Sequence, residues 1–76
     1  MRPECIETLI QNNKIIIFDY LNKKYMIFKK LNNGKINIYL NNIIFDYSVD
    51  LFEYKIGNVT LKEIFSNLDD NSVDIY

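Results

Sequence analysis

The side chains that carry most enzyme chemistry are scarce in this sequence of 76 residues. It contains no histidine, one cysteine (Cys5) and two glycines, Gly34 and Gly57. Histidine is the commonest general acid–base and transition-metal ligand, so no Cys–His or Ser–His pair is available. One thiol makes no zinc set, and two isolated glycines make no phosphate-binding loop. We therefore expect no catalytic residues, no metal and no cofactor.

Asp19 and Asp46 form the one carboxylate pair that merits a test as a catalytic dyad. Each is the fourth residue of the pentapeptide Ile-Ile-Phe-Asp-Tyr, which occurs at 16–20 and again at 43–47. Both copies read as strands, because β-branched and aromatic residues suit a pleated, half-buried surface. As the first and fourth strands of one sheet they lie too far apart to act on one bond. We interpret the two carboxylates as solvated charges that limit edge-to-edge association.

Turn signals divide the middle of the chain, residues 14–48, into an antiparallel meander. We expect two-residue turns at Asn22-Lys23, Asn33-Gly34 and Asn41-Asn42, of which the Asn-Gly pair is the strongest hairpin signal. The first turn would pair Tyr20 with Tyr25 and Phe18 with Ile27, the second Leu31 with Ile36 and Ile27 with Leu40, and the third Ile38 with Phe45. These registers agree on which side chains share a face, and a one-residue slip would scatter them.

Two faces of the sheet follow from this alternation. The core face should hold Ile16, Phe18, Tyr20, Tyr25, Ile27, Leu31, Ile36, Ile38, Leu40, Ile43, Phe45 and Tyr47, with Lys29 as the exception. The second face should hold Ile15, Ile17, Asp19, Met26, Phe28, Lys30, Asn37, Tyr39, Ile44 and Asp46. A sheet face left in water usually alternates more cleanly than this apolar second face does. Either a helix covers it or it is an interface.

Helices are expected at both ends of the chain. Cys5, Ile6, Leu9 and Ile10 form an apolar stripe in a helix over about residues 3–12, with Cys5 as a buried thiol. At the other end, Thr60 and Glu63 have capping-box spacing, and Leu61, Ile64, Phe65 and Leu68 follow at helical intervals. Residues 51–56 favour a fifth strand, with a helical turn from Ser48 as the alternative.

The expected fold class is α+β: a short N-terminal helix, a four- to five-stranded antiparallel meander and a C-terminal amphipathic helix packed on the core face. Residues 1–76 should form one small domain, with 70–76 either a frayed tail or a short added strand. The lone cysteine gives no internal disulfide, and no apolar run or leader pattern points to a membrane or secretion. We therefore expect a cytoplasmic protein.

The second face leads to the first functional hypothesis, a non-catalytic protein-binding or inhibitor module. Its interface residues would be Ile17, Asp19, Met26, Phe28, Lys30, Tyr39, Ile44 and Asp46. Aromatic residues and Met are enriched in interface cores, and exposed apolar patches mark interaction sites. The partner would be another protein or a second copy in a homodimer. A short chain without catalytic groups also fits a phage or mobile-element accessory protein of the counter-defence type.

Lysines suggest an alternative, a nucleic-acid-binding module. Lys23, Lys24, Lys30 and Lys35 lie on the second expected strand and its turns, among aromatic residues that could stack on bases. A net charge of −1 supplies no strong field for such a partner. A small-molecule or nucleotide site, with tyrosines stacking on a base, is a third and weaker option.

Overall fold

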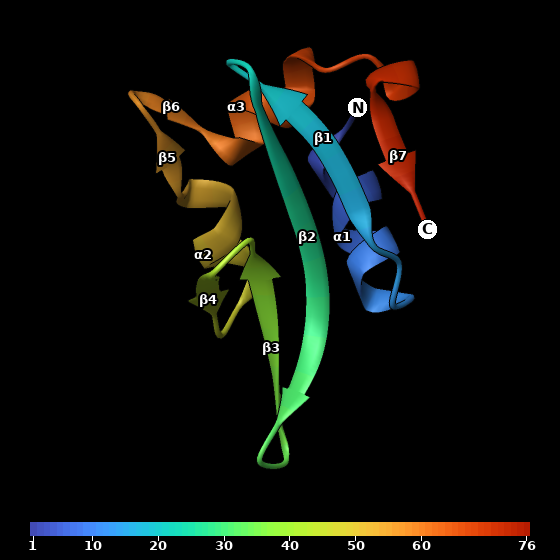
Figure 1. Cartoon of the computed structure of the whole chain (residues 1–76), viewed down its shortest axis with the longest axis vertical. Coiled ribbons are helices and arrows are strands. Elements are labelled where there is room, and N and C mark those ends of the chain that lie inside the picture. Colours follow the sequence, from blue (N-terminus) through green and yellow to red (C-terminus); the bar gives the residue numbers. More distant parts are fainter.

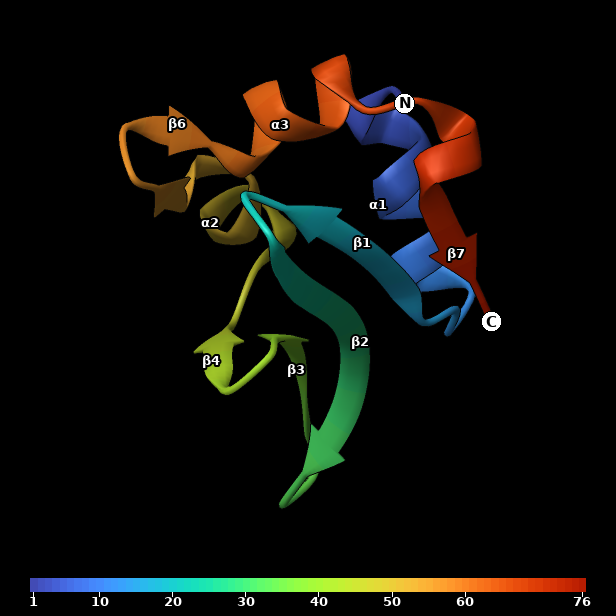
Figure 2. The same cartoon turned by 45° about the horizontal axis from the view of Figure 1, so that its top comes forward.

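The computed structural model describes residues 1–76 as a curved antiparallel sheet with its helices on one side (Figures 1 and 2). The elements in chain order are α1 (Pro3–Gln11), β1 (Ile16–Tyr20), β2 (Lys23–Asn32), β3 (Lys35–Leu40), β4 (Ile43–Phe45), α2 (Ser48–Glu53), β5 (Lys55–Ile56), β6 (Val59–Thr60), α3 (Leu61–Asn67), a 3-10 turn η1 (Asp70–Ser72) and β7 (Val73–Ile75). The main sheet has the order β4-β3-β2-β1-β7. The α+β prediction is confirmed. None of the α-helices is long and apolar enough to span a bilayer.

The β2–β3 and β3–β4 registers are those that the sequence predicts. Leu31 lies opposite Ile36 across the first pair of strands, and Ile38 lies opposite Phe45 across the second. In the Asn33-Gly34 turn the two φ angles are 51° and 84°. Positive φ at both central residues is what a type I′ turn requires, so this hairpin follows directly from its residue types.

The β1–β2 register differs from the prediction by two residues. The turn lies at Leu21-Asn22 rather than Asn22-Lys23, and both of its residues have positive φ, of 52° and 61°. Phe18 therefore lies opposite Tyr25 rather than Ile27. Because side chains alternate with a period of two, this shift leaves every residue on its predicted face.

A single apolar cluster fills the space between the core face and the helices. Helix α1 contributes Ile6 and Ile10, α2 contributes Leu51, and α3 contributes Leu61, Ile64 and Phe65. Phe18 on β1 is 1% exposed; it stacks on Tyr25, with ring centroids 5.4 Å apart, and meets the Phe65 ring edge-on at 5.2 Å. The prediction that the C-terminal helix packs on this face is confirmed.

Two segments near the C-terminus resolve the alternatives left by the sequence. Residues Ser48–Glu53 form helix α2, so the favoured fifth strand over 51–56 is wrong, and Lys55–Ile56 belongs to a separate small hairpin with β6. The strand that completes the five-stranded sheet is instead β7, which pairs with β1 so that Val73 lies opposite Phe18. The tail is therefore an added strand and not a frayed end.

Several side chains predicted to be buried are exposed. Leu31 and Ile36 are 66% and 56% exposed, because the β2–β3 hairpin extends beyond all three helices (Figure 2). Tyr47 is 68% exposed, since β4 ends two residues earlier at Phe45. Cys5 is also exposed, so its interpretation as a buried thiol is wrong.

The predicted capping interaction begins α3. Thr60 Oγ1 accepts a hydrogen bond from the Glu63 N–H at 3.2 Å, and the Thr60 hydroxyl lies 3.2 Å from Glu63 Oε1, to which it donates. Thr60→Ala should lower the free energy of unfolding by about 1 kcal/mol, since the N–H of Glu63 loses its acceptor. Urea denaturation of both proteins measures this change. Thr60→Ser, which keeps the hydroxyl, should retain most of the stability; equal losses in both variants would contradict the capping role.

Candidate functional site

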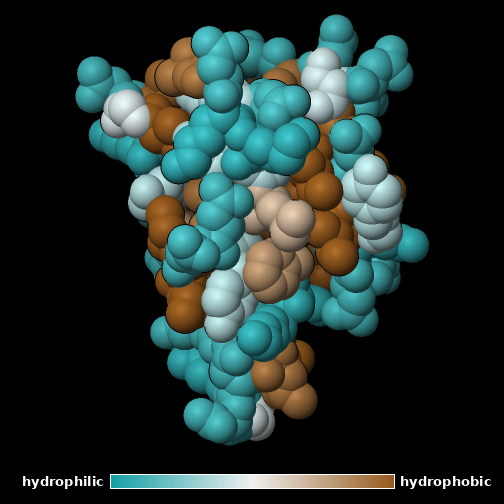
Figure 3. Space-filling view, in the orientation of Figure 1, coloured by the Kyte–Doolittle hydropathy of each residue, from teal (hydrophilic) through white to brown (hydrophobic).

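The second face of the sheet is covered by no helix. The helical side chains of the core, from Ile6 to Phe65, all pack against the core face, and no second-face side chain belongs to that cluster. Figure 3 views the molecule from the sheet side and shows apolar surface gathered over β1 and the middle of β2. Of the two alternatives in the sequence, a helix on each face or a face left open, the structure has the open face.

An aromatic pair lies at the centre of this face. The Phe28 and Tyr39 rings, on adjacent strands β2 and β3, stack with centroids 5.0 Å apart and planes inclined by 8°. Both side chains are half-buried, although nothing but the sheet lies beneath them. Ile44 of β4 lies opposite Tyr39 and is 55% exposed. The pair is thus rigid, apolar and accessible, as the anchor of an interface must be.

The β1 side of the face differs from the prediction because of the two-residue register shift. Ile17 lies opposite Met26, which is 38% exposed, and not opposite Phe28. Phe28 is now a diagonal neighbour of Ile17, still within reach of an aromatic ring. The apolar residues Ile17, Phe28, Tyr39 and Ile44, which the predicted registers would align in one row, therefore form a staggered patch.

Next to the stack lies a chain of polar side chains, of which the expected interface includes Tyr39 and Asp46 but not Asn32, Lys35 or Asn37. Asn32 Nδ2 donates to Tyr39 Oη at 2.7 Å and to Asn37 Oδ1 at 3.3 Å. Asn37 Nδ2 in turn donates to Asp46 Oδ1 at 2.8 Å, and Lys35 Nζ lies 3.1 Å from the same oxygen. Asn37 is 8% exposed, which a polar residue tolerates because its amide is hydrogen-bonded. The network fixes the orientation of the Tyr39 ring. Counting alternate residues from the Asn33-Gly34 turn would have placed Asn32 and Lys35 on this face.

Charged residues line the face, and the structure pairs most of them. Asp19 lies 3.5 Å from Lys24, and Asp46 has Lys35 and Asn37 as partners. Asp19 lies on β1 and Asp46 directly follows β4, with β2 and β3 between these strands, and each carboxylate has its own lysine. They form no dyad. Lys30 has no carboxylate within ion-pair distance.

The lysines of the nucleic-acid alternative do not converge. Lys23 lies over the Tyr25 ring, with Nζ 5.3 Å from its centroid, while Lys24 and Lys35 are ion-paired. Lys30 lies six residues from Lys24 along β2, a separation of about 20 Å in an extended strand. These four side chains therefore line no common groove.

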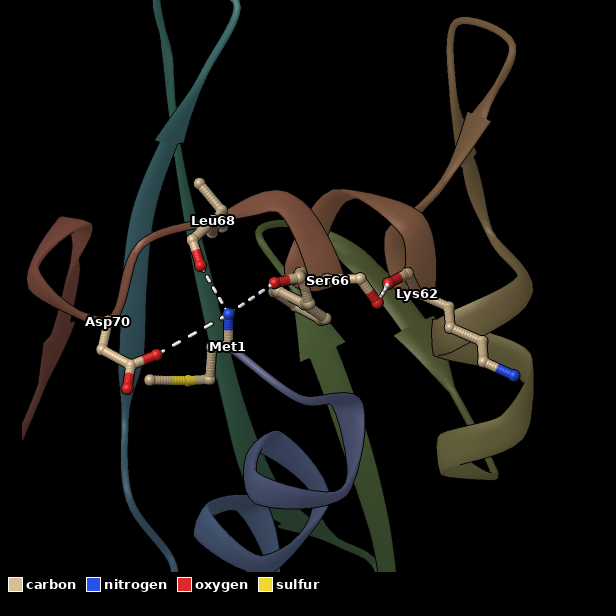
Figure 4. Close-up of polar contacts among 6 residues, drawn as sticks. Met1, Lys62, Ser66, Leu68 and Asp70 are labelled. Atoms are coloured by element: carbon tan, nitrogen blue, oxygen red, sulfur yellow. Dashed lines mark hydrogen bonds and ion pairs between the residues drawn. The ribbon is translucent and has the colours of Figure 1, made fainter.

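Surface depressions elsewhere contain few side chains that could bind a ligand or take part in a reaction. The largest is lined by residues of α1 and the end of α3, where the Met1 amino group donates to the carbonyl oxygens of Phe65, at 2.9 Å, and Leu68 (Figure 4). Asp70 lies 3.6 Å from the same nitrogen. A cation suits a helix C-terminus, and here these groups satisfy one another. No three His, Cys, Asp or Glu side chains lie close enough together to hold a metal ion.

No known protein family, no curated protein and no solved structure matches this chain. The function of the second face is therefore inferred from the residues of that face.

Proposed function

We propose that this chain is a non-catalytic protein-binding module that engages its partner through the second face. The observation that carries the proposal is the uncovered Phe28–Tyr39 stack, flanked by Ile17, Met26 and Ile44. Burying these side chains against a partner would remove apolar surface from water, as the core face already does against the helices. Aromatic residues and Met are the types enriched at interface cores.

The size of the sheet is compatible with this role. A standard interface takes about 800 Å² from each partner, which is roughly 15% of the 5172 Å² accessible surface of the chain. The five strands contain 5, 10, 6, 3 and 3 residues. At about 3.3 Å per residue and about 4.8 Å between strands they cover about 430 Å² in projection. The second face can therefore supply about half of such an area without help from the helices.

The partner we propose is a larger protein whose working surface the bound chain blocks. A rigid stack among apolar neighbours is suited to a fixed surface, and the paired rim charges Asp19–Lys24 and Lys35–Asp46 leave little net charge on the face. Inhibition by occlusion needs no catalytic group. An accessory protein of a phage or mobile element that counters a host defence would act in this way.

The test is a double substitution at the stack. Phe28→Ser with Tyr39→Ser should abolish capture of the partner from native-host lysate, because loss of a central aromatic anchor weakens binding by about 2 kcal/mol or more. Val49→Ser is the matched control: this α2 side chain is 56% exposed and lies away from the second face. It should leave capture unchanged.

Sedimentation of the purified wild-type chain separates the possible outcomes. A dimer that the double substitution converts to monomer would make a second copy the occupant of the face. A monomeric wild type that captures no protein dependent on Phe28 and Tyr39 would end the proposal. Salt-sensitive binding of an oligonucleotide, lost in Lys30→Glu, would instead support the nucleic-acid alternative.

A further inference from the structure

The hairpin end of β2 has a neighbour on one side alone. The β1–β2 ladder ends where Ile16 meets Ile27, whereas the β2–β3 ladder continues to the pair of Asn32 and Lys35. Before β1, the chain turns away, because the Lys14 N–H donates to the Leu9 carbonyl at 3.0 Å. Figures 1 and 2 show this end of the hairpin projecting beyond every other element. Residues 28–32 of β2 therefore form an open sheet edge.

The open edge presents specific backbone groups. Met26 uses its carbonyl and its N–H toward the β3 side, in bonds of 2.9 Å to Asn41 N and Asn41 Oδ1. The direction of the backbone N–H and C=O groups alternates along an antiparallel strand, so these groups of residues 28 and 30 also point toward β3. The N–H and C=O groups of Lys29 and Leu31 point to the opposite side, where β1 does not extend far enough to pair with them. These four groups lack a strand partner.

The side chains at this edge have a distinct chemistry. Leu31 and Ile36 lie opposite each other, 66% and 56% exposed, beside a shallow depression that Asn13, Lys29 and Lys30 also line. Lys29 Nζ reaches only the Gln11 carbonyl, at 3.1 Å, and neither Lys29 nor Lys30 has a carboxylate partner. An isolated two-stranded ribbon is marginally stable in water. The edge thus combines free hydrogen-bonding groups, unpaired positive charge and uncovered apolar surface.

We propose that this edge binds an extended acidic segment of another protein by antiparallel strand addition. Residues of the segment opposite Lys29 and Leu31 would exchange backbone hydrogen bonds with them, as in other β-augmented complexes. Acidic side chains opposite Lys29 and Lys30 would supply the carboxylate partner that both ammonium groups lack, and an apolar residue opposite Leu31 would cover it. This site goes beyond the second-face function and stands independently of it.

A second copy of the chain is the weaker occupant. Antiparallel pairing of two β2 edges centred on Lys29 or Lys30 places that lysine directly opposite its own equivalent, which is destabilising. Centring on Leu31 leaves an overlap of about three residues before the Asn33-Gly34 turn interrupts it. Lysines on an edge discourage pairing between like strands. The same two charges favour a strand of opposite charge.

The test uses the full-length chain and a capped synthetic peptide, Thr-Thr-Val-Glu-Glu-Tyr, whose Val would lie opposite Leu31. Titration of isotopically labelled protein should shift the amide signals of Lys29 and Leu31. Hydrogen exchange at these two amides should slow about tenfold when the peptide is at ten times its Kd. Exchange at Ile27, already paired with β1, should stay unchanged and reports an intact sheet.

Two matched peptides distinguish strand addition from charge attraction. N-methylation of Val and of the second Glu removes the N–H groups that face β2, and should abolish the protection. N-methylation of the preceding Thr and the first Glu, whose N–H groups point outward, should preserve it.

Lys30→Glu should weaken binding of the peptide several-fold, and the loss should be larger at low salt. Equal binding of both methylated peptides, or no shift at Lys29 and Leu31, would overturn the proposal. So would protection that appears on concentrating the protein alone, which would identify a second copy as the occupant.

Discussion

Phe18→Ala is expected to lower the free energy of unfolding by about 3–5 kcal/mol. The ring is 1% exposed and lies between Tyr25 and Phe65, so its removal leaves a cavity where the sheet meets α3. A chain of 76 residues has a total stability of about 4–11 kcal/mol. The substitution should therefore remove between about a quarter and all of this stability. Urea denaturation followed by circular dichroism measures the change.

Phe28→Ala is the matched control for that experiment. Phe28 is the same residue type on the neighbouring strand, but it lies half-buried on the second face and contacts Tyr39. Loss of one half-buried aromatic stack on a sheet face should cost about 1 kcal/mol. If the two alanine variants were equally destabilised, the assignment of core face and second face would be wrong.

Removal of residues 73–76 is expected to be about as destabilising, lowering the free energy of unfolding by about 3.5–5 kcal/mol. The deletion exposes the partners of Val73, which is 7% exposed, and breaks the two backbone hydrogen bonds between Ile15 and Tyr76, at 3.0 and 2.9 Å. Burial of one Val side chain stabilises by about 1.5–3 kcal/mol, and each lost bond adds about 1 kcal/mol. The newly exposed β1 edge should also promote association.

Urea denaturation and sedimentation velocity together measure both consequences of the deletion. Tyr76→Ala is the control, because its side chain is 68% exposed and its backbone bonds remain. Tyr76→Ala should leave the sedimentation coefficient unchanged and the free energy of unfolding close to that of the wild type. A truncated chain with wild-type stability and assembly would show that β7 contributes nothing to the sheet.

The faces of the meander could be predicted because they depend on residue-level rules. Asn33-Gly34 sets one hairpin through its backbone preferences, and the period of two then sorts the neighbouring side chains. Membership of the second face followed from the same alternation. Its exposure did not, because the side on which three helices pack is decided by the whole core. The shift at Leu21 escaped prediction since leucine rarely adopts a positive φ.

The segment after β4 shows where local patterns reach their limit. Phe52, Tyr54 and Ile56 alternate with charged residues, which favours a strand, yet Leu51 is fully buried from within helix α2. A short apolar run cannot separate the two structures by its periodicity. The open hairpin edge was equally hidden, because it depends on β2 being longer than β1, and strand length is poorly marked in the sequence.

The pairing of β1 with β7 joins residues 16–18 to residues 73–75. While the chain is being synthesised, β1 leaves the ribosome before β7 does, because the chain emerges from its N-terminus onward. Throughout that interval one side of β1 remains without its neighbour, and a nascent chain with such an unpaired strand is prone to aggregate. A chaperone that recognises Ile-Ile-Phe while translation proceeds would protect the protein at its most vulnerable stage.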